Sequence, residues 1–516
     1  MKKVFFFIFF INSSVISSAQ YLLGQSSSNY AGIHGVYLNP AQVADSRYKL
    51  QIHLAGYENY LYNNYLVWNA PYSIVGVMTN TVSNKYRNIH GAILFDDETY
   101  LREKLNGRTK HLRAGAEVRG PGLLYTINDK HSIALGTRVR AGISLTNTSE
   151  SVARILRHGT TQPELIQAED FGNKLNINSN GMAELSGTYG RVLLDNEDEF
   201  WKIGITIKRL IGLHNGHLLA KNIDYEFVND PLVVDKNNIL LNNISAQYGI
   251  TDEGSYRNFR FTPAWLLGRA AAGAGWGADL GMVYEYRPDA LKYSYREKGQ
   301  QKRDASQNKY LYRISISLLD IGRVHYRNPA YVYAYNVQRQ NLLVDEDYFD
   351  NVKGVDGMKY AINQTLGVSD DERVYSYHAL LPTSLQASID YHLKDKIYVN
   401  ALLLHCITSS NKIAFTSPSV LALTPRYENK WIEVAVPVSL TDNYSRLALG
   451  VGVRLGLLYF GSDNILSTFN IGSPKGMEFY FGLQVPIFRK PPESSLLCYP
   501  KPVKKGIFGF LKKDRY

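Results

Sequence analysis

The sequence lacks an apolar run long enough to cross a membrane as a helix. Its N-terminal apolar run covers only residues 4–11, whereas a spanning helix needs about 20 apolar residues. This run follows two lysines and precedes the small residues Ser17-Ser18-Ala19, an order that is typical of a secretory signal peptide. We therefore predict a cleaved signal over residues 1–19 and no transmembrane helix.

Cysteine is scarce, since Cys406 and Cys498 are the only two in the chain. Two cysteines exclude a disulfide framework. One lies in a strand-like stretch and the other near the C-terminus, so we expect no bridge between them. No cysteine lies near the predicted cleavage site, so a lipid-modified N-terminus is not expected.

Catalytic motifs are also lacking. The chain contains no Gly-x-Ser-x-Gly and no His-Glu-x-x-His. His214 and His217 have a metal-like spacing but no acidic or cysteine partner nearby, and the glycine-rich residues 273–277 precede a strand rather than a helix. We predict no enzyme activity, no cofactor and no metal. A hydrolase assembled from distant Ser, His and acidic residues stays open as an alternative.

The body of the chain has no basic excess of the kind that binds nucleic acid. The net charge of +11 comes largely from the ends, because the last 28 residues hold eight Lys or Arg and two acidic residues. Between signal and tail, 47 basic residues face 44 acidic ones, so we expect no nucleic-acid partner. The basic tail, residues 489–516, is interpreted either as solvated or as lying on an anionic membrane surface.

What the chain does contain is a two-residue alternation in segment after segment. In residues 446–460, Leu447, Leu449 and Val451 alternate with small residues and Arg454. Charged residues stay off the apolar face, and a Lys or Arg on a lipid-facing position near mid-depth costs about 2–4 kcal/mol. The pattern therefore favours the wall of a transmembrane β-barrel over a soluble β-sandwich. The 38 tyrosines fit the aromatic girdles of such a wall.

The fold class predicted is all-β: a transmembrane antiparallel β-barrel of about 14 strands, with long extracellular loops, an N-terminal plug-like segment and a short basic C-terminal tail. Residues 48–57 are a fifteenth candidate strand. Either they belong to the plug, or residues 90–96 supply a sixteenth strand. The predicted strands are 64–78, 112–127, 132–146, 181–193, 200–211, 256–268, 276–287, 309–319, 324–336, 383–393, 397–409, 430–440, 446–460 and 476–488.

Long connections are expected on the extracellular side at residues 147–180, 212–255, 287–309, 338–381 and 409–429. The predicted domains are the signal (1–19), an N-terminal plug or periplasmic segment (20–47), the barrel (48–488) and a periplasmic tail (489–516). Within the second of these, Asn39, Pro40 and Ala41 form a candidate plug motif. The alternative interpretation of that motif is an ordinary Asx-Pro turn.

The polar face of the predicted strands carries both signs of charge. Balanced signs give no ion preference, so we expect a filled or plugged lumen rather than an ion passage. The candidate lumen-facing residues are Lys49, Arg138, Arg140, Lys202, Lys208, Asp279, Glu285, Arg313, Asp390, His392, Glu433, Arg454 and Glu478.

Several short motifs carry a family resemblance. They are Asn39-Pro40-Ala41 and the runs at 275–281, 317–322, 381–385, 424–428 and 460–464. With them the chain resembles a Bacteroidota family of outer-membrane β-barrels of unknown function, related to fatty-acid-transporter-type and type IX secretion-associated barrels. The resemblance covers nearly the whole mature chain. It implies an integral outer-membrane protein of a Gram-negative bacterium, with outer-membrane lipid as a partner. The aromatic-rich closing strand, residues 476–488, predicts recognition by the barrel-assembly machinery.

Three function hypotheses remain after this comparison. The first is a non-enzymatic barrel, either a partner in secretion or surface assembly or a transporter of a small apolar ligand. The alternatives are an outer-membrane hydrolase and a structural barrel that links envelope layers through its tail. The sequence does not choose a ligand or a protein partner.

Overall fold

The computed structural model describes residues 22–159, 170–196, 198–229, 237–257, 262–297, 300–349, 352–472 and 474–491. The predicted signal peptide and most of the predicted basic tail lie outside these ranges. Within them, no helix is both long and apolar enough to cross a membrane.

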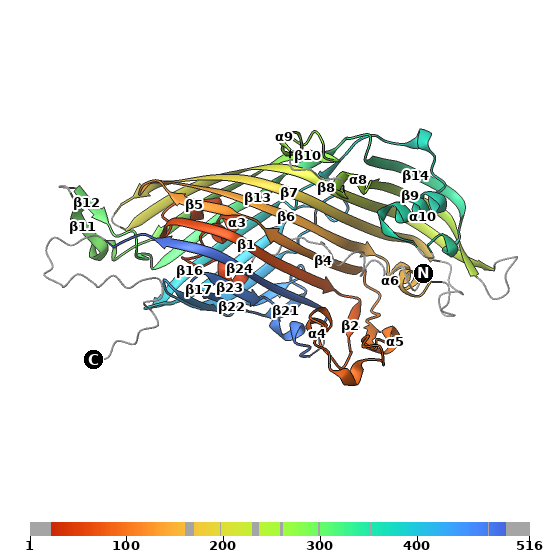
Figure 1. Cartoon of the computed structure of the whole chain (residues 1–516), viewed down its shortest axis with the longest axis horizontal. Helices are drawn as coiled ribbons and strands as arrows, with labels where there is room; N and C mark the ends of the chain where they lie inside the picture. Colours follow the sequence, from red (N-terminus) through yellow and green to blue (C-terminus); the bar gives the residue numbers. More distant parts are fainter. Residues whose placement is uncertain are drawn as a thin grey trace.

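Fourteen antiparallel strands close into one barrel, which confirms the predicted fold class (Figure 1). The barrel closes where β1 pairs with β24, from Tyr48 opposite Phe488 to Tyr62 opposite Gly476. We call the end at Tyr48 and Phe488 the near end and the opposite end the far end. The barrel strands, four of them in two pieces, are β1 (Tyr48–Asn63), β4 and β5 (Lys110–Arg119, Gly122–Thr126), β6 (His131–Thr148), β7 (Asp170–Asp195), β8 (Glu199–Asn229), β10 (Gly273–Tyr286), β13 (Tyr312–Tyr326), β15 and β16 (Tyr377–Leu380, Ser384–Lys394), β17 (Ile397–Cys406), β18 (Val420–Glu428), β19 and β20 (Ile432–Ala435, Val438–Thr441), β21 and β22 (Arg446–Leu449, Val451–Leu455), β23 (Leu458–Ser462) and β24 (Gly476–Phe488).

The alternation of the sequence becomes an outer and an inner face of the wall. Along β18, buried and exposed side chains alternate at every residue. Leu421, Leu423 and Tyr427 are 45%, 51% and 42% exposed on the outside, whereas Arg426 and Glu428 are buried inside. An apolar outer face with every backbone group paired between strands is what a lipid-embedded wall requires.

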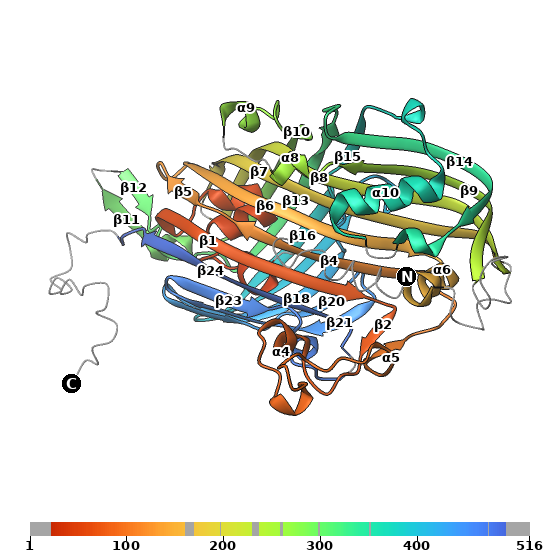
Figure 2. The same cartoon turned by 45° about the vertical axis from the view of Figure 1, so that its right-hand side comes forward.

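On one side of the far end the wall continues beyond the barrel. The first half of β8 pairs with β10, up to Gly212 opposite Gly273, and its second half pairs with β9 (Asn237–Thr251). β9 in turn pairs with β14 (Val332–Val344). Apolar side chains of this far-end sheet form one core with α6 (Glu150–His158) and α10 (Gly354–Leu366). The sheet and α10 lie together at one end of the molecule in Figures 1 and 2.

A small lobe, residues 64–109, projects sideways from the far rim (Figure 2). Its core is a cluster of aromatic rings that includes Trp68, Tyr72 and Tyr100. The lobe contains β2 (Leu66–Trp68), α4 (Ile74–Met78), η2 (Asn84–Tyr86), α5 (Asp97–Tyr100) and β3 (Leu101–Glu103). The other short elements between barrel strands are α8 (Gly254–Arg257), α9 (Pro263–Leu266), η3 (Ala290–Tyr293), β11 (Ser294–Glu297), β12 (Gln300–Arg303), η4 (Glu346–Phe349), η5 (Asp370–Glu372) and α11 (Ile465–Thr468).

Two predicted strands, 64–78 and 256–268, are wrong. The first lies mainly in the lobe, where its apolar residues pack into a local aromatic core rather than against lipid. The second overlaps the end of α8 and contains α9, and Pro263 begins α9, a position where proline favours a helix start. The first barrel strand is instead β1, which includes the segment interpreted as a fifteenth candidate.

Three other stretches needed correction. Residues 324–336 contain the end of β13 and the start of β14. Residues 446–460 are two barrel strands, because Gly456 turns the chain with a φ of +57° between β22 and β23; Tyr459 is therefore buried inside rather than exposed to lipid. The missed strand β18 fell within the predicted loop 409–429. These errors offset each other, so the count of fourteen stayed correct.

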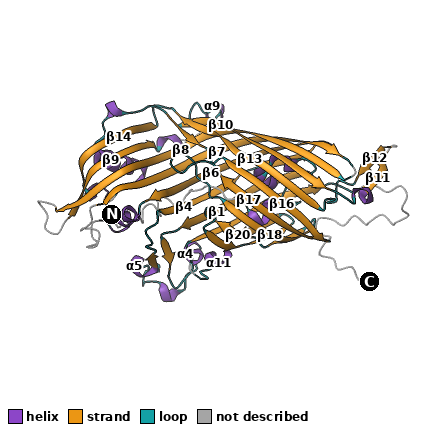
Figure 3. Cartoon of the chain, turned by 180° about the vertical axis from the view of Figure 1, so that it is seen from behind, coloured by secondary structure: helices purple, strands orange, loops and turns teal. Residues whose placement is uncertain are grey.

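The predicted long connections also differ from the structure. Most of residues 212–255 is strand, in β8 and β9. The connection at 287–309 lies at the near end, because it joins the near ends of β10 and β13 and carries the β11–β12 hairpin. Figure 3 shows this hairpin at the end of the barrel opposite to β9 and β14. The prediction put the connection at 287–309 on the extracellular side because it assumed that short turns and long loops alternate strictly along the chain.

Candidate functional site

The inside of the barrel is filled on the near side by the N-terminal segment, residues 22–47. It contains α2 (Leu23–Ser26), α3 (Ile33–Leu38) and the 3-10 helix η1 (Pro40–Val43), and most of its side chains are buried. Wall glycines make room for it. A Cβ at Gly204 would overlap the backbone of Pro40, and one at Gly281 would overlap the Asn39 side chain. The segment therefore lies directly against the inner wall.

Asn39 fixes this segment to two wall strands. Its Nδ2 lies 2.9 Å from Ser315 Oγ, 3.0 Å from Ile316 O and 3.2 Å from Met282 O. Its Oδ1 accepts a hydrogen bond of 2.9 Å from the backbone N–H of Ala41. The side chain thus makes the Asx turn of the alternative interpretation and also holds the segment against β10 and β13. Asn39 is 1% exposed.

Most of the sequence-predicted lumen residues lie inside the wall, each less than a tenth exposed. They are Arg138, Arg140, Lys202, Lys208, Asp279, Glu285, Arg313, Asp390, Glu433, Arg454 and Glu478. His392 lies at the near rim, half-buried, with Nε2 2.9 Å from Asp395 O. Lys49 does not face the lumen: β1 shifts register between Tyr48 and Leu50, and Lys49 is exposed at the near rim.

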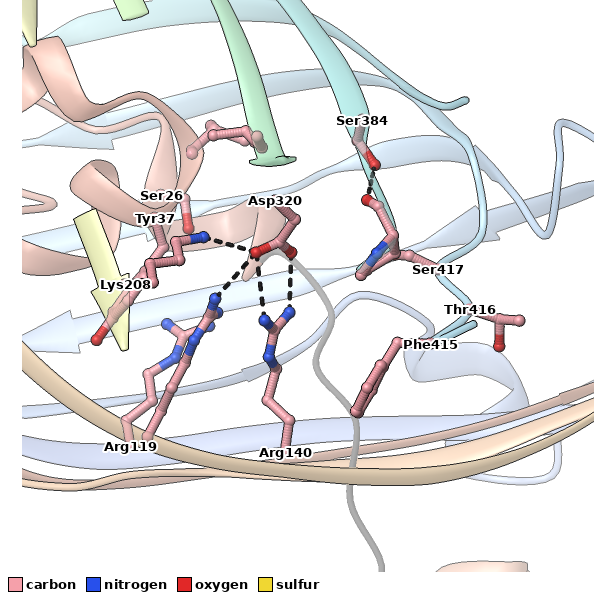
Figure 4. Close-up of a pocket in the computed structure, with 14 residues that line it drawn as sticks. Ser26, Tyr37, Arg119, Arg140, Lys208, Asp320, Ser384, Phe415, Thr416 and Ser417 are labelled. Carbon is pink, nitrogen blue, oxygen red and sulfur yellow. Dashed lines mark hydrogen bonds and ion pairs between the residues drawn. The ribbon is translucent and has the colours of Figure 1, made fainter. Parts of the chain in front are cut away.

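One group of charges surrounds Asp320 in the middle of the lumen (Figure 4). Its carboxylate lies 2.6 Å from Lys208 Nζ and 2.8 Å from an Arg140 nitrogen, with Arg138 at 3.6 Å. Glu184 pairs with both arginines at 2.8 Å. A φ of +52° at Asp320 interrupts the regular course of β13. The cations are thus matched by acids within the network, which leaves no single-sign surface for ions.

A second group joins the end of the N-terminal segment to the near mouth. Asp45 pairs with Arg47 at 2.7 Å and with Arg287 at 2.8 Å, and Arg287 also pairs with Glu285 at 2.5 Å. Burial raises the pKa of the Asp45 carboxyl. The positive charges of Arg47, Lys309 and Arg287 lower that pKa by more than burial raises it, so it lies well below its usual value. Asp45 is therefore a carboxylate held by surrounding cations.

Wall charges also bind polar groups of the N-terminal segment directly. Ser28 Oγ donates a hydrogen bond of 2.7 Å to Glu433. Arg313 donates one of 2.8 Å to the carbonyl oxygen of Ser27 and pairs with Asp390 at 3.0 Å. The predicted mixed charges thus serve to hold the segment as well as to pair with one another.

A second stretch enters the lumen from the far end. After β17 the chain turns inward, and residues 409–417, which we call the inner loop, cross to the opposite wall. The amide of Asn180 on β7 donates to the Ala414 carbonyl oxygen at 3.1 Å. On the other side, the backbone N–H of Leu380 donates to Ile413 O at 2.9 Å. Phe415 is 3% exposed.

Apolar residues meet inside the lumen where the two fillers approach each other. Leu23 and Leu38 of the N-terminal segment pack against inward-facing wall residues such as Leu404. Phe415 of the inner loop packs in a second cluster with Met182 and other residues of the wall. A cavity of about 30 Å³ lies between the fillers and has room for water. Its lining residues include Leu38, Leu319, Pro382 and Phe415 on the apolar side and Arg119, Arg140, Lys208 and Asp320 on the charged side.

The remaining candidates have structural partners. His214 and His217 lie in β8, not in a loop, and bond to Thr251 Oγ1 at 3.0 Å and Asn215 Oδ1 at 2.9 Å respectively. Among the residues that the structure describes, no three His, Cys, Asp or Glu side chains are grouped so as to hold a metal ion. Cys406 is a half-buried free thiol, and Cys498 lies outside the described ranges.

Sequence reasoning missed several of these residues. Asn176, Asn178 and Asn180 were assigned to a loop, although asparagine at every second position is itself a strand-like signal. Asp320 was not among the candidate lumen residues, and Phe415 fell within the predicted loop 409–429. No local pattern marks Phe415, because its burial depends on β7 and β15, which are distant in the sequence.

Solved structures of a FadL homologue and of two toluene transporters are similar to this chain. A FadL homologue of Pseudomonas aeruginosa shares 12% identity, with 88% of this chain and 94% of that chain covered and a TM-score of 0.36. The toluene transporter TbuX of Ralstonia pickettii shares 8% identity, with 92% and 100% covered and a TM-score of 0.39. The toluene transporter TodX of P. putida shares 9% identity, with 89% and 95% covered and a TM-score of 0.39.

These are distant likenesses, and the barrel assignment depends on the strand pairing of this chain itself. No curated protein matches the chain. Residues 40–463 match a protein family described as "Family of unknown function (DUF5723)", and the chain belongs to that family.

Proposed function

We propose that this protein is an integral outer-membrane barrel that carries a small apolar ligand across or into the membrane without chemical change. The apolar outer face and closed strand pairing support a membrane position, because outer-membrane barrels have this construction. In this proposal the near end faces the periplasm, as does the tail that follows β24. The far-end sheet and the lobe then lie outside the cell.

The observation that carries the proposal is the apolar surface inside the lumen. A water-filled channel is lined by polar residues, yet here Leu38, Leu404 and Phe415 belong to apolar clusters on the inner side of the wall. These clusters lie on either side of the cavity that separates the N-terminal segment from the inner loop. They offer an apolar ligand a surface that shields it from water.

The N-terminal segment is the proposed plug of this pathway, with Asn39, Pro40 and Ala41 as its seat. Its contacts with β10 and β13 hold it where Leu23 and Leu38 cover the apolar wall. In the closed state the cavity of about 30 Å³ is too small for a ligand of several carbon atoms. Transport therefore requires the plug, the inner loop or both to shift.

The test is uptake of the apolar fluorescent probe N-phenyl-1-naphthylamine by Gram-negative cells that express the barrel. Phe415→Ala removes a ring beside the cavity, and we expect it to raise the initial uptake rate at least threefold. Leu404→Asn places an amide in the apolar cluster and should lower the rate by a similar factor. Phe469→Ala is the matched control, because Phe469 is 60% exposed outside the lumen.

The proposal fails if uptake by expressing cells equals that of cells without the barrel. It also fails if folded lumen variants and the outer-surface control behave alike. Folding of each variant is checked by the shift in gel mobility that intact barrels show before and after boiling.

A further inference from the structure

A small cavity lies at the near end of the barrel, where three parts of the chain meet. We call it the near-mouth cavity; its volume is about 20 Å³, which has room for one particle of the size of a water molecule. The N-terminal segment contributes Asp45 and Arg47 to its lining, the wall contributes Lys202, and the connection before β13 contributes Lys309. It shares no lining residue with the cavity between the two fillers.

Cations outnumber carboxylates around the near-mouth cavity. Asp45 and Glu285 are the carboxylates in its lining, and both already have a close partner, because Arg287 lies 2.8 Å from the first and 2.5 Å from the second. Four cations surround these two carboxylates: Arg47, Arg287, Lys202 and Lys309. The group therefore has an excess of two positive charges when all its members are ionised.

Neighbouring carboxylates do not supply the missing negative charge. Next to the cavity, two arginines and two carboxylates pair among themselves and are balanced: Arg313, Arg426, Asp390 and Glu428. Asp195 lies 4.0 Å from Arg287, but it is 39% exposed and pairs with Arg303. The excess thus remains after the surrounding ion pairs are counted.

The two lysines are the cations with the weakest compensation. Lys309 is 6% exposed, and its Nζ donates to Gln307 O at 3.1 Å; among the residues that the structure describes, no carboxylate forms an ion pair with it. Lys202 is 2% exposed, and its Nζ donates to Ala44 O at 2.9 Å, with Glu285 at 3.8 Å. Buried charges are normally paired with a counter-ion.

The electrostatics of Lys309 agree with this count. Burial lowers the pKa of the Lys309 amine to about 7, because the Asp45 carboxylate offsets only part of the lost hydration. A negative charge inside the cavity would stabilise the ammonium form. The volume selects the kind of charge, because phosphate and other polyatomic anions are too large for a space that fits one water molecule.

We propose that the near-mouth cavity is a binding site for a monatomic anion, chloride, held by the ammonium groups of Lys202 and Lys309. The bound anion connects the wall, the N-terminal segment and the connection before β13. It thereby strengthens the hold on the end of the N-terminal segment at Asp45 and Arg47. The site does not depend on the proposed transport of an apolar ligand.

The test compares trypsin cleavage after Arg47 of the purified barrel in sodium chloride and in sodium gluconate of equal ionic strength. Gluconate is too large for the cavity, and a pH of 6 keeps Lys309 protonated. We expect cleavage after Arg47 to be at least threefold slower in chloride. Cleavage after Lys412 in the inner loop should be equal in the two salts, which controls for any effect of the salt on trypsin.

Lys309→Met keeps most of the aliphatic chain and removes the charge. It should abolish the chloride effect, and in gluconate it should make cleavage after Arg47 slower than in the wild-type barrel, because a cation without a counter-ion has been removed. Lys394→Met is the matched control, since Lys394 is exposed at the near rim, and it should keep the full chloride effect. If Lys309→Met does not fold, Lys202→Met takes its place.

Crystals of the wild-type barrel grown in sodium bromide locate the anion directly, since bromide scatters anomalously. We expect an anomalous peak within hydrogen-bond distance of Lys309 Nζ. The proposal is overturned if bromide peaks appear only elsewhere, or if chloride does not slow cleavage after Arg47. A chloride effect that Lys309→Met retains, with faster cleavage in both salts, would make the lysine purely structural and overturn the proposal as well.

Discussion

Two stretches of the chain fill the same lumen by different physical means. The N-terminal segment is held by charged groups around Asp45 and Ser28 and by direct contact with wall glycines. The inner loop is held by neutral amides and one backbone bridge. Breaking a buried ion pair leaves a charge without a partner, whereas a neutral hydrogen bond contributes only about 1 kcal/mol net. The first filler is therefore part of the core, and the second is the easier one to displace.

The largest effect expected from this difference comes from Asp320→Asn. It removes the charge that faces Lys208, Arg140 and Arg138, and breaking a buried network of this kind costs about 3–5 kcal/mol. The change is measured by unfolding in urea, with the loss of the gel mobility shift as the readout. Asp129→Asn is the control, because Asp129 is 61% exposed. Equal midpoints for the two variants would show that the lumen charges are well solvated.

Asn39→Ala comes next. It removes the donor to Ser315 and Ile316 and the acceptor for the Ala41 N–H, and leaving such buried groups unpaired costs about 1–3 kcal/mol. The expected result is a lower urea midpoint together with faster proteolysis within residues 22–47. Asn242→Ala on the far-end sheet is the matched control. Unchanged proteolysis would contradict the assignment of Asn39 as the anchor.

Asn178→Ala with Asn180→Ala should affect the inner loop alone. Loss of about 1 kcal/mol of holding free energy corresponds to a roughly fivefold larger open population. Trypsin cleavage after Lys412 should therefore be about five times faster, while the urea midpoint stays nearly constant. Equal acceleration at Arg47, the one trypsin site in the N-terminal segment, would mean that the two fillers move as one unit.

The smallest effect concerns pH. The folded-state pKa of Asp45 is lowered, so its stabilisation is present above the unfolded-state pKa of about 4 and is lost as the pH falls below it. Asp45→Asn should therefore reduce the loss of stability between pH 5 and pH 3, measured as the urea midpoint. Residues 409–417 contain no acidic group, so trypsin access at Lys412 after pre-incubation at these pH values should not depend on Asp45.

The sequence predicted the orientation of some side chains correctly and of others wrongly. The inward positions of Arg138, Glu285 and Arg454 followed from parity alone, because side chains alternate across a strand. Lys49 was misplaced because a register shift in β1 reverses the inward and outward positions. The single strand predicted over 446–460 missed a two-residue turn, which also reverses these positions and so places Tyr459 inside.

The contents of the lumen could be anticipated only in part. Mixed charge predicted a filled interior, and the Asn39-Pro40-Ala41 motif predicted a plug seat, which stays a prediction. The inner loop and the apolar clusters were not predicted. In the run Leu402-Leu403-Leu404, Leu402 and Leu404 face the lumen and Leu403 faces outward. Because all three are leucine, the sequence does not distinguish the inward positions from the outward one.

The sequence by itself determined the wall: a chain of alternating apolar and polar residues can satisfy its backbone in lipid only as a closed antiparallel barrel. Which segments enter that barrel was decided by the tertiary structure. Asn39 meets Ser315, and Asn178 meets Ala414, across more than two hundred residues of chain. A period of two fixes the face on which a side chain lies, but only closure of the barrel brings opposite inner faces close enough to hold what lies between them.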